Sequence, residues 1–402
     1  MHAPFSKTRT DHLPAIIAGL FTLGSATTVF YMPVFFSEEL KFSGAQIGML
    51  FALLAVCGVL ASFPAGLGND RITSRTLIGI GLSVQAAILI LMGYVRSFPF
   101  FAAIFFIWAL ANNLFRISLE VQLLKTDQGT HTGRRFGNFA AIRFFGLALG
   151  TVLAGYLLAL LDFRYSFYFV AVMCLLLLWA VRLLPPTKIA QVRLAEYRAD
   201  FSNPRIILLA IWVFIFCLHW GVEHTCYSLF LRHEFRLPTH LLGWYMSAEF
   251  FAVVLAAFFI GRRIKQNGPL LDYMIVGVLL SGIGHIGMVY PPVYWSVAFR
   301  AIHGLGDGLI IVIFYLGLAQ LFAVERVGGS NGIANLAMML GMVTSALIAG
   351  PAGERFGYGL PIWISGFLLI ALTLPLLWIR LIRPAPQAVV NGSRPSNNAK
   401  IF

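Results

Sequence analysis

The amino-acid sequence predicts an all-α membrane protein with twelve transmembrane helices arranged as two six-helix bundles. Of its 402 residues, 59% are hydrophobic and only 11% are charged, and the mean hydropathy is +0.83. A soluble globular protein carries about a quarter charged residues. The apolar residues form long continuous runs, and one long polar segment, residues 185–205, separates six runs from six more.

Each apolar run is long enough to cross a membrane as a helix, which needs about 20 residues. A transmembrane strand would instead show short alternating segments. We expect spans at residues 14–36, 44–66, 76–95, 98–124, 137–160, 165–184, 206–230, 241–260, 271–290, 293–322, 330–350 and 359–383. The first run is too long for the core of a signal peptide, so we expect it to be retained.

The polar segment divides the chain into an N-terminal bundle (residues 1–184), a cytoplasmic linker (185–205), a C-terminal bundle (206–383) and a cytoplasmic tail (384–402). Glycines support a duplication, because Gly137, Gly146 and Gly155 recur 195 residues later as Gly332, Gly341 and Gly350. A coincidence among 38 glycines is the alternative. Two six-span halves related by an axis along the membrane normal are a known transporter architecture, with the substrate near the midplane.

The net charge of +13 reflects topology rather than a nucleic-acid-binding face. Lysines and arginines are scattered among short loops, and most fall on one side if the N-terminus lies inside, as the positive-inside rule requires. We therefore expect a multi-pass protein of the plasma membrane, such as a bacterial inner membrane, with both termini in the cytoplasm and no nucleic-acid partner. The four cysteines, Cys57, Cys174, Cys217 and Cys226, all fall in expected spans without a C-x-x-C pair. They predict neither a disulfide framework nor a metal site.

The loop after the second span carries a motif, Gly66, three residues, Asp70-Arg71, and then Arg75. Here the chain resembles the major facilitator superfamily, although Thr73 stands where that family usually has glycine. The resemblance implies that Gly66, Asp70, Arg71 and Arg75 belong to a loop that controls how the two halves open and close. A charged turn that only fixes topology is the alternative.

The tenth span contains the most unusual polar residues, Arg300, His303 and Asp307, whose i, i+3, i+7 spacing places them on one helix face. Ionisable groups at membrane depth are costly and usually turned toward a cavity or a partner. Histidine also titrates near neutral pH. We interpret this stripe as part of a proton-coupling apparatus, with a structural network that only holds helices together as the alternative.

Two further stripes point to the same apparatus. His219, Glu223 and Tyr227 repeat every four residues in the seventh span, and Tyr245 and Glu249 do so in the eighth. We expect both stripes to face one cavity together with Asp307, where an acid would bind a proton on one side of the membrane and release it on the other. The proton-coupling candidates are Glu223, Glu249, Arg300, His303 and Asp307. His219, Tyr227 and Tyr245 are candidates for substrate binding, with a hydrogen bond from Asn335.

The N-terminal half supplies the other substrate candidates. Asn112, Asn113, Arg116 and Glu120 lie in the fourth span, and Arg143 lies in the fifth. Glu120 and Arg143 would both lie toward the cytoplasm, where each compensates the other's desolvation and a polar substrate can compete for either. A permanent strut is the alternative. Thr27 and Tyr31 share a face of the first span and either line the cavity or join helices.

By helix and residue type, this layout resembles the branch of the superfamily that contains lactose permease and its nucleoside and aromatic-acid relatives. The likeness rests on Glu120 with Arg143, on acids in the seventh and eighth spans, and on a base, a histidine and an acid in the tenth. The spacing from Arg300 to Asp307 is one residue longer than in the permease pattern. The resemblance implies proton-coupled uptake with Glu120 and Arg143 near the substrate.

We therefore predict a proton-coupled symporter that moves a small polar organic solute by alternating access, as a monomer in the lipid bilayer. An efflux antiporter for lipophilic compounds is the alternative, and the 36 phenylalanines suit it, although they equally suit a lipid-facing surface. A membrane-embedded enzyme is disfavoured by the short loops and by the lack of a metal-ligand cluster. No G-x-x-x-x-G-K-[ST] loop occurs, so we expect gradient coupling and no cofactor.

Overall fold

The structure is a computed structural model that describes residues 12–29, 31–32, 35–42, 44–126, 132–187, 203–264, 270–321 and 327–382. The elements before residue 187 are α2 (Leu13–Val29), a π-helical turn η1 (Phe35–Glu39), α4 (Gly44–Arg71), α5 (Ser74–Met92), α6 (Phe98–Lys125), α7 (Thr132–Leu160) and α8 (Phe163–Val181). Those after residue 203 are α10 (Pro204–Val222), η2 (Glu223–Tyr227), α11 (Ser228–His233), α12 (Thr239–Arg263), α13 (Leu270–Gly287), α14 (Val293–Leu321), α15 (Val327–Phe356) and α16 (Gly359–Ile382). Throughout the described ranges the regular structure is helical, which confirms the predicted fold class.

Eleven described helical segments are long and apolar enough to cross a membrane, and α2 is a shorter apolar helix of 17 residues. The expected first span corresponds to α2 followed by Tyr31, Met32 and η1. The seventh span joins α10, η2 and α11 into one run, Ile206–His233. Several helices extend past their apolar runs, and α7, for example, begins at Thr132 instead of residue 137. Polar end residues can stay helical there because the helix satisfies its own backbone groups.

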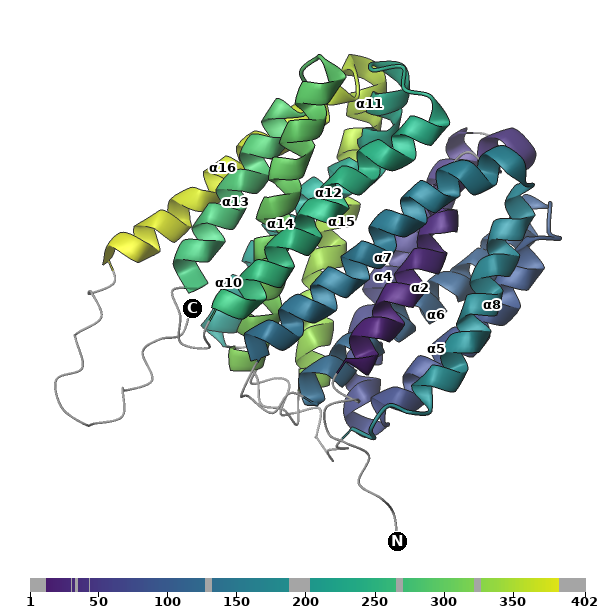
Figure 1. Ribbon diagram of the computed structural model, residues 1–402, viewed down its shortest axis with the longest axis horizontal. Helices are drawn as coiled ribbons and strands as arrows, with labels where there is room; N and C mark the ends of the chain where they lie inside the picture. Colours follow the sequence, from purple (N-terminus) through teal and green to yellow (C-terminus); the bar gives the residue numbers. More distant parts are fainter. Residues whose placement is uncertain are drawn as a thin grey trace, which may run out of the picture.

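The helices form two groups that lean against each other (Figure 1). Before residue 187, α2 packs against α7 and α8, and α5 packs against α6 and α8. After residue 203, α13 packs against α14 and α16, and α10 packs against α15. The division into bundles, linker and tail stays a prediction, because residues 188–202 and 383–402 lie outside the described part of the chain.

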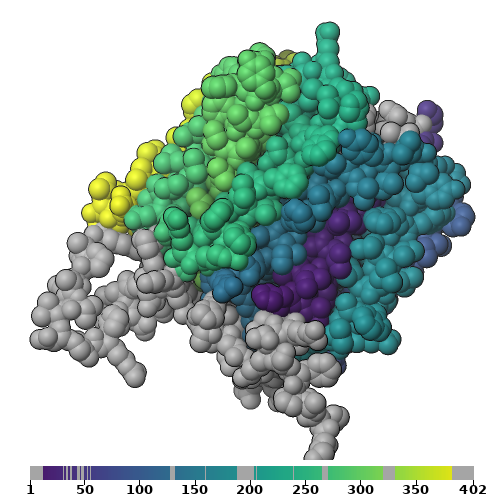
Figure 2. Space-filling model, in the orientation of Figure 1, coloured from purple at the N-terminus to yellow at the C-terminus, as the bar shows by residue number. Residues whose placement is uncertain are grey.

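The two groups meet chiefly along α7 with α12 and along α4 with α15. Figure 2 shows α7 in blue lying directly against α12 in green on this face of the molecule. Glycines permit the approach, because a Cβ built on Gly137 of α7 would lie 2.8 Å from the Cα of Gly261 in α12. The helix backbones therefore touch with no side chain between them, as small residues allow in membranes.

The repeated glycines make matching contacts in the two halves. Gly137 of α7 faces α12, and its counterpart Gly332 of α15 faces α4 at Ser62 and Phe63. Gly146 faces α2, and its counterpart Gly341 faces α10. Equivalent positions thus contact equivalent helices, which supports the predicted duplication.

Candidate functional site

The ion pairs of Arg300 organise the interior of the C-terminal helices. Its guanidinium forms ion pairs with Glu223 of η2 and Glu249 of α12, and it lies over the Tyr227 ring at 3.9 Å from the centroid. Arg300 is only 2% exposed. The π-helical turn η2 begins at Glu223 and ends at Tyr227, so two of these three residues that meet Arg300 belong to it. Such turns are rare and often occur at functional sites.

His303 lies one turn farther along α14 and faces three carboxylates. Its Nε2 is 3.3 Å from Glu223 Oε1, 3.8 Å from Glu249 Oε1 and 3.8 Å from Asp307 Oδ2. Its Nδ1 is 3.0 Å from the Ser281 hydroxyl. The buried His303 imidazole is therefore within ion-pair distance of all three acids that the sequence analysis proposed as proton-binding residues.

Asp307 is held by donors from two other helices. It accepts hydrogen bonds from Trp220 Nε1 at 2.6 Å and from the Ser281 hydroxyl at 2.7 Å, and His219 Nε2 lies 3.4 Å away. His285 of α13 completes the cluster, with Nε2 3.0 Å from Glu223 Oε1 and Nδ1 2.8 Å from the Ser365 hydroxyl. We call the following residues the C-terminal network: His219, Trp220, Glu223, Glu249, Ser281, His285, Arg300, His303 and Asp307.

The structure corrects the expected surroundings of these residues. We expected them to line an open, shared cavity, but the ionisable members are 0–9% exposed and packed against one another. The physical reason is that opposite charges from α10, α12 and α14 compensate each other's desolvation only when they touch. The three acids do share one site, as predicted, and that site is closed.

Three predicted substrate residues also lie in or beside this closed network. His219 is fully buried beside Asp307, and Tyr227 lies under Arg300. The Tyr245 hydroxyl is hydrogen-bonded to that of Ser296 and is buried. Their placement therefore favours a role in holding the network over direct contact with a solute.

A second polar group, the interface cluster, lies between the two halves. Arg143 Nη1 of α7 is 3.3 Å from Glu120 Oε1 of α6, which is the predicted pair. From the other half, Tyr315 donates to Glu120 at 3.2 Å, and the amides of Asn331 and Asn335 each donate to it at 3.4 Å. Arg143 also donates to the Tyr315 hydroxyl at 3.4 Å. We define the cluster as Asn113, Arg116, Glu120, Arg143, Tyr315, Asn331 and Asn335.

Three other residues of the N-terminal half that we predicted to bind substrate, Asn112, Thr27 and Tyr31, lie outside the interface cluster. Asn112 is half-buried on α6, next to the cluster. Thr27 donates to the Gly24 carbonyl of its own helix at 2.7 Å. The Tyr31 hydroxyl lies beside Gly155 of α7 and Gly243 of α12, where the two halves meet. In the described part of the chain, neither Thr27 nor Tyr31 makes a side-chain hydrogen bond to the interface cluster.

The loop motif contains a buried ion pair that the sequence did not identify. Asp70 Oδ1 is 2.8 Å from Lys125 Nζ of α6, and both side chains are almost fully buried. Lys125 also donates to the Asn69 carbonyl at 2.8 Å. Arg71 is exposed, and Arg75 donates to the Leu184 carbonyl at 3.4 Å. The pair of Asp70 with Lys125 fastens α4 to α6.

Two triads in the C-terminal network have the spacing of metal ligands. The ligand atoms of His219, His303 and Asp307 lie within 4.8 Å of one another, as do those of Glu223, His285 and His303. Arg300 already pairs with Glu223, and Asp307 already accepts from Trp220 and Ser281. The positive charge of Arg300 and the hydrogen bonds that Asp307 already accepts both oppose metal binding at these atoms.

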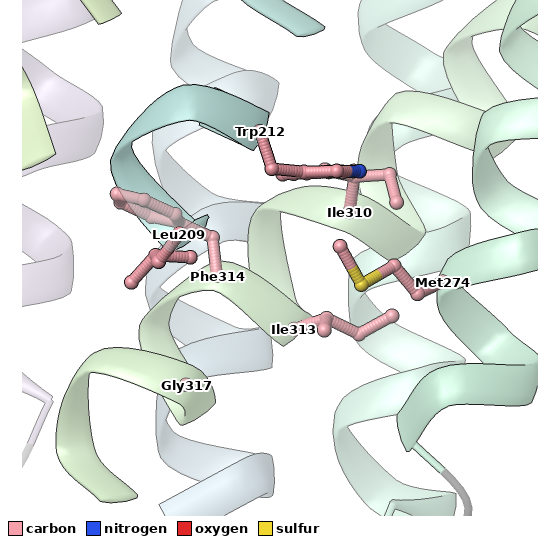
Figure 3. A pocket seen from close by; sticks show the side chains of 7 residues that line it. All are labelled: Leu209, Trp212, Met274, Ile310, Ile313, Phe314 and Gly317. Carbon is pink, nitrogen blue, oxygen red and sulfur yellow. The ribbon is translucent and has the colours of Figure 1, made fainter. Parts of the chain in front are cut away.

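An apolar pocket lies between α10, α13 and α14 (Figure 3). Its lining residues are Leu209, Trp212, Met274, Ile310, Ile313, Phe314 and Gly317. None of them carries a charge, so this pocket does not suit a polar solute.

Sequence reasoning missed several members of these clusters. His285 is a single histidine in the ninth span, without an ionisable neighbour one turn away to draw attention, although any ionisable residue in a span is a signal. Lys125 was assigned to the cytoplasmic loops because it follows an apolar run. Trp220 and Tyr315 resemble ordinary span aromatics, whose polar atoms need a partner when buried.

Comparison with known proteins agrees with this architecture. The profile of the family described as Major Facilitator Superfamily matches residues 15–231 and 213–401. An uncharacterized MFS-type transporter of Enterobacter sp. (strain 638) is 27% identical over 190 residues, which are 47% of this chain and 48% of that protein. A similarly described protein of Yersinia enterocolitica is 27% identical over 179 residues, 44% of this chain and 46% of that protein. The matches thus span about half the length of these relatives.

Among solved structures, the human organic anion transporter MFSD10 (TETRAN) has a similar fold, with a TM-score of 0.76. The superposition covers 92% of this chain and 99% of that chain at 13% sequence identity. At this identity the similarity concerns the fold alone.

Proposed function

This chain belongs to the major facilitator superfamily, and from that premise we propose that it is a proton-coupled symporter for a small polar organic solute. It would work by alternating access as a monomeric carrier, not as an enzyme. We place it in the plasma membrane, such as a bacterial inner membrane, with both termini in the cytoplasm.

The observation that carries the proposal is the charge balance of the C-terminal network. Arg300 contributes one positive charge, and Glu223, Glu249 and Asp307 contribute three negative charges if all are ionised. With neutral histidines the sum is therefore −2, in a region whose ionisable members are at most 9% exposed. Burying uncompensated charge is costly. Protons on the acids or on His219, His285 and His303 would remove that cost, so the network is suited to hold exchangeable protons.

The interface cluster provides the site for a solute. Glu120 of one half accepts hydrogen bonds from Tyr315, Asn331 and Asn335 of the other half. Alternating access requires such contacts to break when the halves separate. A polar solute that replaces them binds one state better than the other, which is the condition for a ligand to shift the equilibrium.

Trp220 is the network member that is least buried. Its indole N–H donates to Asp307 at 2.6 Å, while the residue itself is only partly buried. A solute that contacted the Trp220 ring would therefore change the hydrogen bonding of Asp307.

The alternative is an efflux antiporter for lipophilic compounds. The apolar pocket in Figure 3 includes Ile310, one turn from Asp307, but its cavity of about 20 Å³ would have to widen to admit such a compound. The direction of proton movement separates the two functions.

The test uses proteoliposomes that contain the full chain and the pH indicator pyranine. Sugars, nucleosides, hydroxy acids and lipophilic cations are added outside, and the luminal pH is followed. A symporter acidifies the lumen when its solute is added, whereas an antiporter makes it alkaline. Protein-free vesicles and the Asp307→Asn variant are the controls. A solute that crosses without any protein-dependent pH change would contradict proton coupling.

A further inference from the structure

Four cations lie inside the described helices, and they differ in whether a carboxylate pairs with them. Lys125 pairs with Asp70 at 2.8 Å, Arg143 pairs with Glu120 at 3.3 Å, and Arg300 pairs with two glutamates. Among the described residues, Arg116 of α6 has no carboxylate within the 4.0 Å of an ion pair. Its one hydrogen bond goes to the Asn113 side-chain oxygen of its own helix, at 3.3 Å.

Arg116 also lies where a second positive charge is already present. Glu120 lies one turn farther along α6, and Arg143 Nη1 is 3.3 Å from the Glu120 carboxylate. The Glu120 carboxylate is engaged by Arg143 and by three residues of the other half. Two guanidiniums therefore share one carboxylate, and the interface cluster has a net charge of +1. Such an excess inside a membrane is costly unless a ligand supplies the missing negative charge.

We propose that Arg116 recognises a solute bearing a single carboxylate, held between the halves beside Arg143. A guanidinium binds a carboxylate through two parallel hydrogen bonds. A phosphate monoester is a poorer match, because it carries about −1.5 to −2 charges near neutral pH. The solute is thus an organic monoanion. This inference rests on the proposed transport function, because it takes the interface cluster as the solute site.

The binding test compares acids with their neutral amides. Benzoate and benzamide, hexanoate and hexanamide, and phenyl phosphate are titrated against the purified full-length protein by tryptophan fluorescence, without any pH gradient. The acids bind, and the amides and the phosphate ester bind at least 10-fold more weakly. Arg116→Gln weakens acid binding by about 10- to 100-fold, because it replaces a charged two-hydrogen-bond contact with a neutral one. Arg116→Lys keeps the charge and weakens binding by less than Gln does.

The matched control is Arg263→Gln, because Arg263 is exposed at the end of α12. It leaves acid binding unchanged. Amides that bind as tightly as acids, the absence of binding by every acid, or acid affinity that survives Arg116→Gln would each overturn the inference.

A ligand-free measurement guards against misfolding of the variant. In the empty protein an unpaired charge is a cost, so Arg116→Gln melts at or above the wild-type temperature, whereas Arg300→Gln melts lower. A fall as large as that of Arg300→Gln would show that Arg116 is a structural strut and would overturn the inference. Because binding is measured without a pH gradient, this experiment tests the anion site independently of proton coupling, which the pyranine assay tests.

Discussion

The C-terminal network and the interface cluster use similar side chains in opposite ways. In the network, Arg300 contacts two carboxylates and is 2% exposed. In the interface cluster, the Arg143 side chain is 25% exposed, and the contacts of Glu120 are 3.2–3.4 Å long. The first arrangement lies within one half and is closed to solutes, whereas the second joins the halves by longer bonds. The proposed symport would use both, because a protonation site must exclude competing ions while a solute site must open.

The largest expected effect breaks the closed arrangement. Arg300→Gln leaves Glu223 and Glu249 buried without their cation, and breaking a buried ion pair typically costs about 3–5 kcal/mol. We expect a clear fall in the thermal midpoint of the detergent-purified protein, partly restored in the double variant Arg300→Gln with Glu249→Gln. Arg143→Gln serves as the comparison and should cost less, because Arg143 is partly exposed. Equal falls in the thermal midpoint for Arg300→Gln and Arg143→Gln would show that the network and the interface cluster depend equally on their ion pairs for stability.

The next effect concerns the hydrogen bond from Trp220 to Asp307 within the network. Trp220→Phe keeps the ring and removes the N–H that Asp307 accepts at 2.6 Å. Hydrogen bonds to charged groups are worth about 1.5–3 kcal/mol, so we expect the pH dependence of transport to shift and coupling to weaken by about 10-fold or more.

Trp212→Phe is the matched control for this variant. Trp212 lies two turns earlier on α10, and its buried Nε1 has no hydrogen-bond partner among the described residues. It should leave the pH profile in place. An identical change in both variants would assign the effect to ring packing instead of to the Asp307 contact.

The smallest expected effect concerns the contacts between the halves. Tyr315→Phe removes the hydroxyl that bonds Glu120 and Arg143, and each such bond contributes about 1 kcal/mol or less. We expect the conformational equilibrium to shift modestly toward states in which the two halves are separated at the interface cluster.

Spin-label distances between cysteines placed at the exposed residues Ile72 and Arg263 can measure that shift, since these lie at the ends of α4 and α12. The four native cysteines are buried, so labelling should be selective. The mean distance or its spread should increase in Tyr315→Phe. An unchanged distribution would show that this hydroxyl does not hold the halves together.

The sequence predicted the helices and their polar faces better than their meeting points. Hydrophobic run length locates a span, and spacing places Arg300, His303 and Asp307 on one face. Neither the run length nor the spacing shows which other helix that face contacts. Arg300, for example, pairs with Glu223, which is 77 residues away in the sequence. Glu120 and Arg143 were paired correctly because consecutive helices with known direction bring them to one depth.

The sequence could not predict whether the charged residues line an open cavity or pack against one another. The number of charges in the spans suggested a wet cavity, but whether charges face water or one another depends on packing in three dimensions. His285 and Lys125 were missed for the same reason, since each becomes informative only beside its partner, Glu223 or Asp70. Trp220 became informative only when its N–H was found on Asp307.

The most direct test of the account separates driven uptake from exchange in the Asp307→Asn variant, with a solute found in the pyranine assay. Vesicles with an alkaline interior measure accumulation against a gradient, and vesicles preloaded with the solute measure exchange. We predict that Asp307→Asn abolishes accumulation driven by pH and leaves part of the exchange. Accumulation at the wild-type level in Asp307→Asn would contradict the claim that the C-terminal network couples protons to transport.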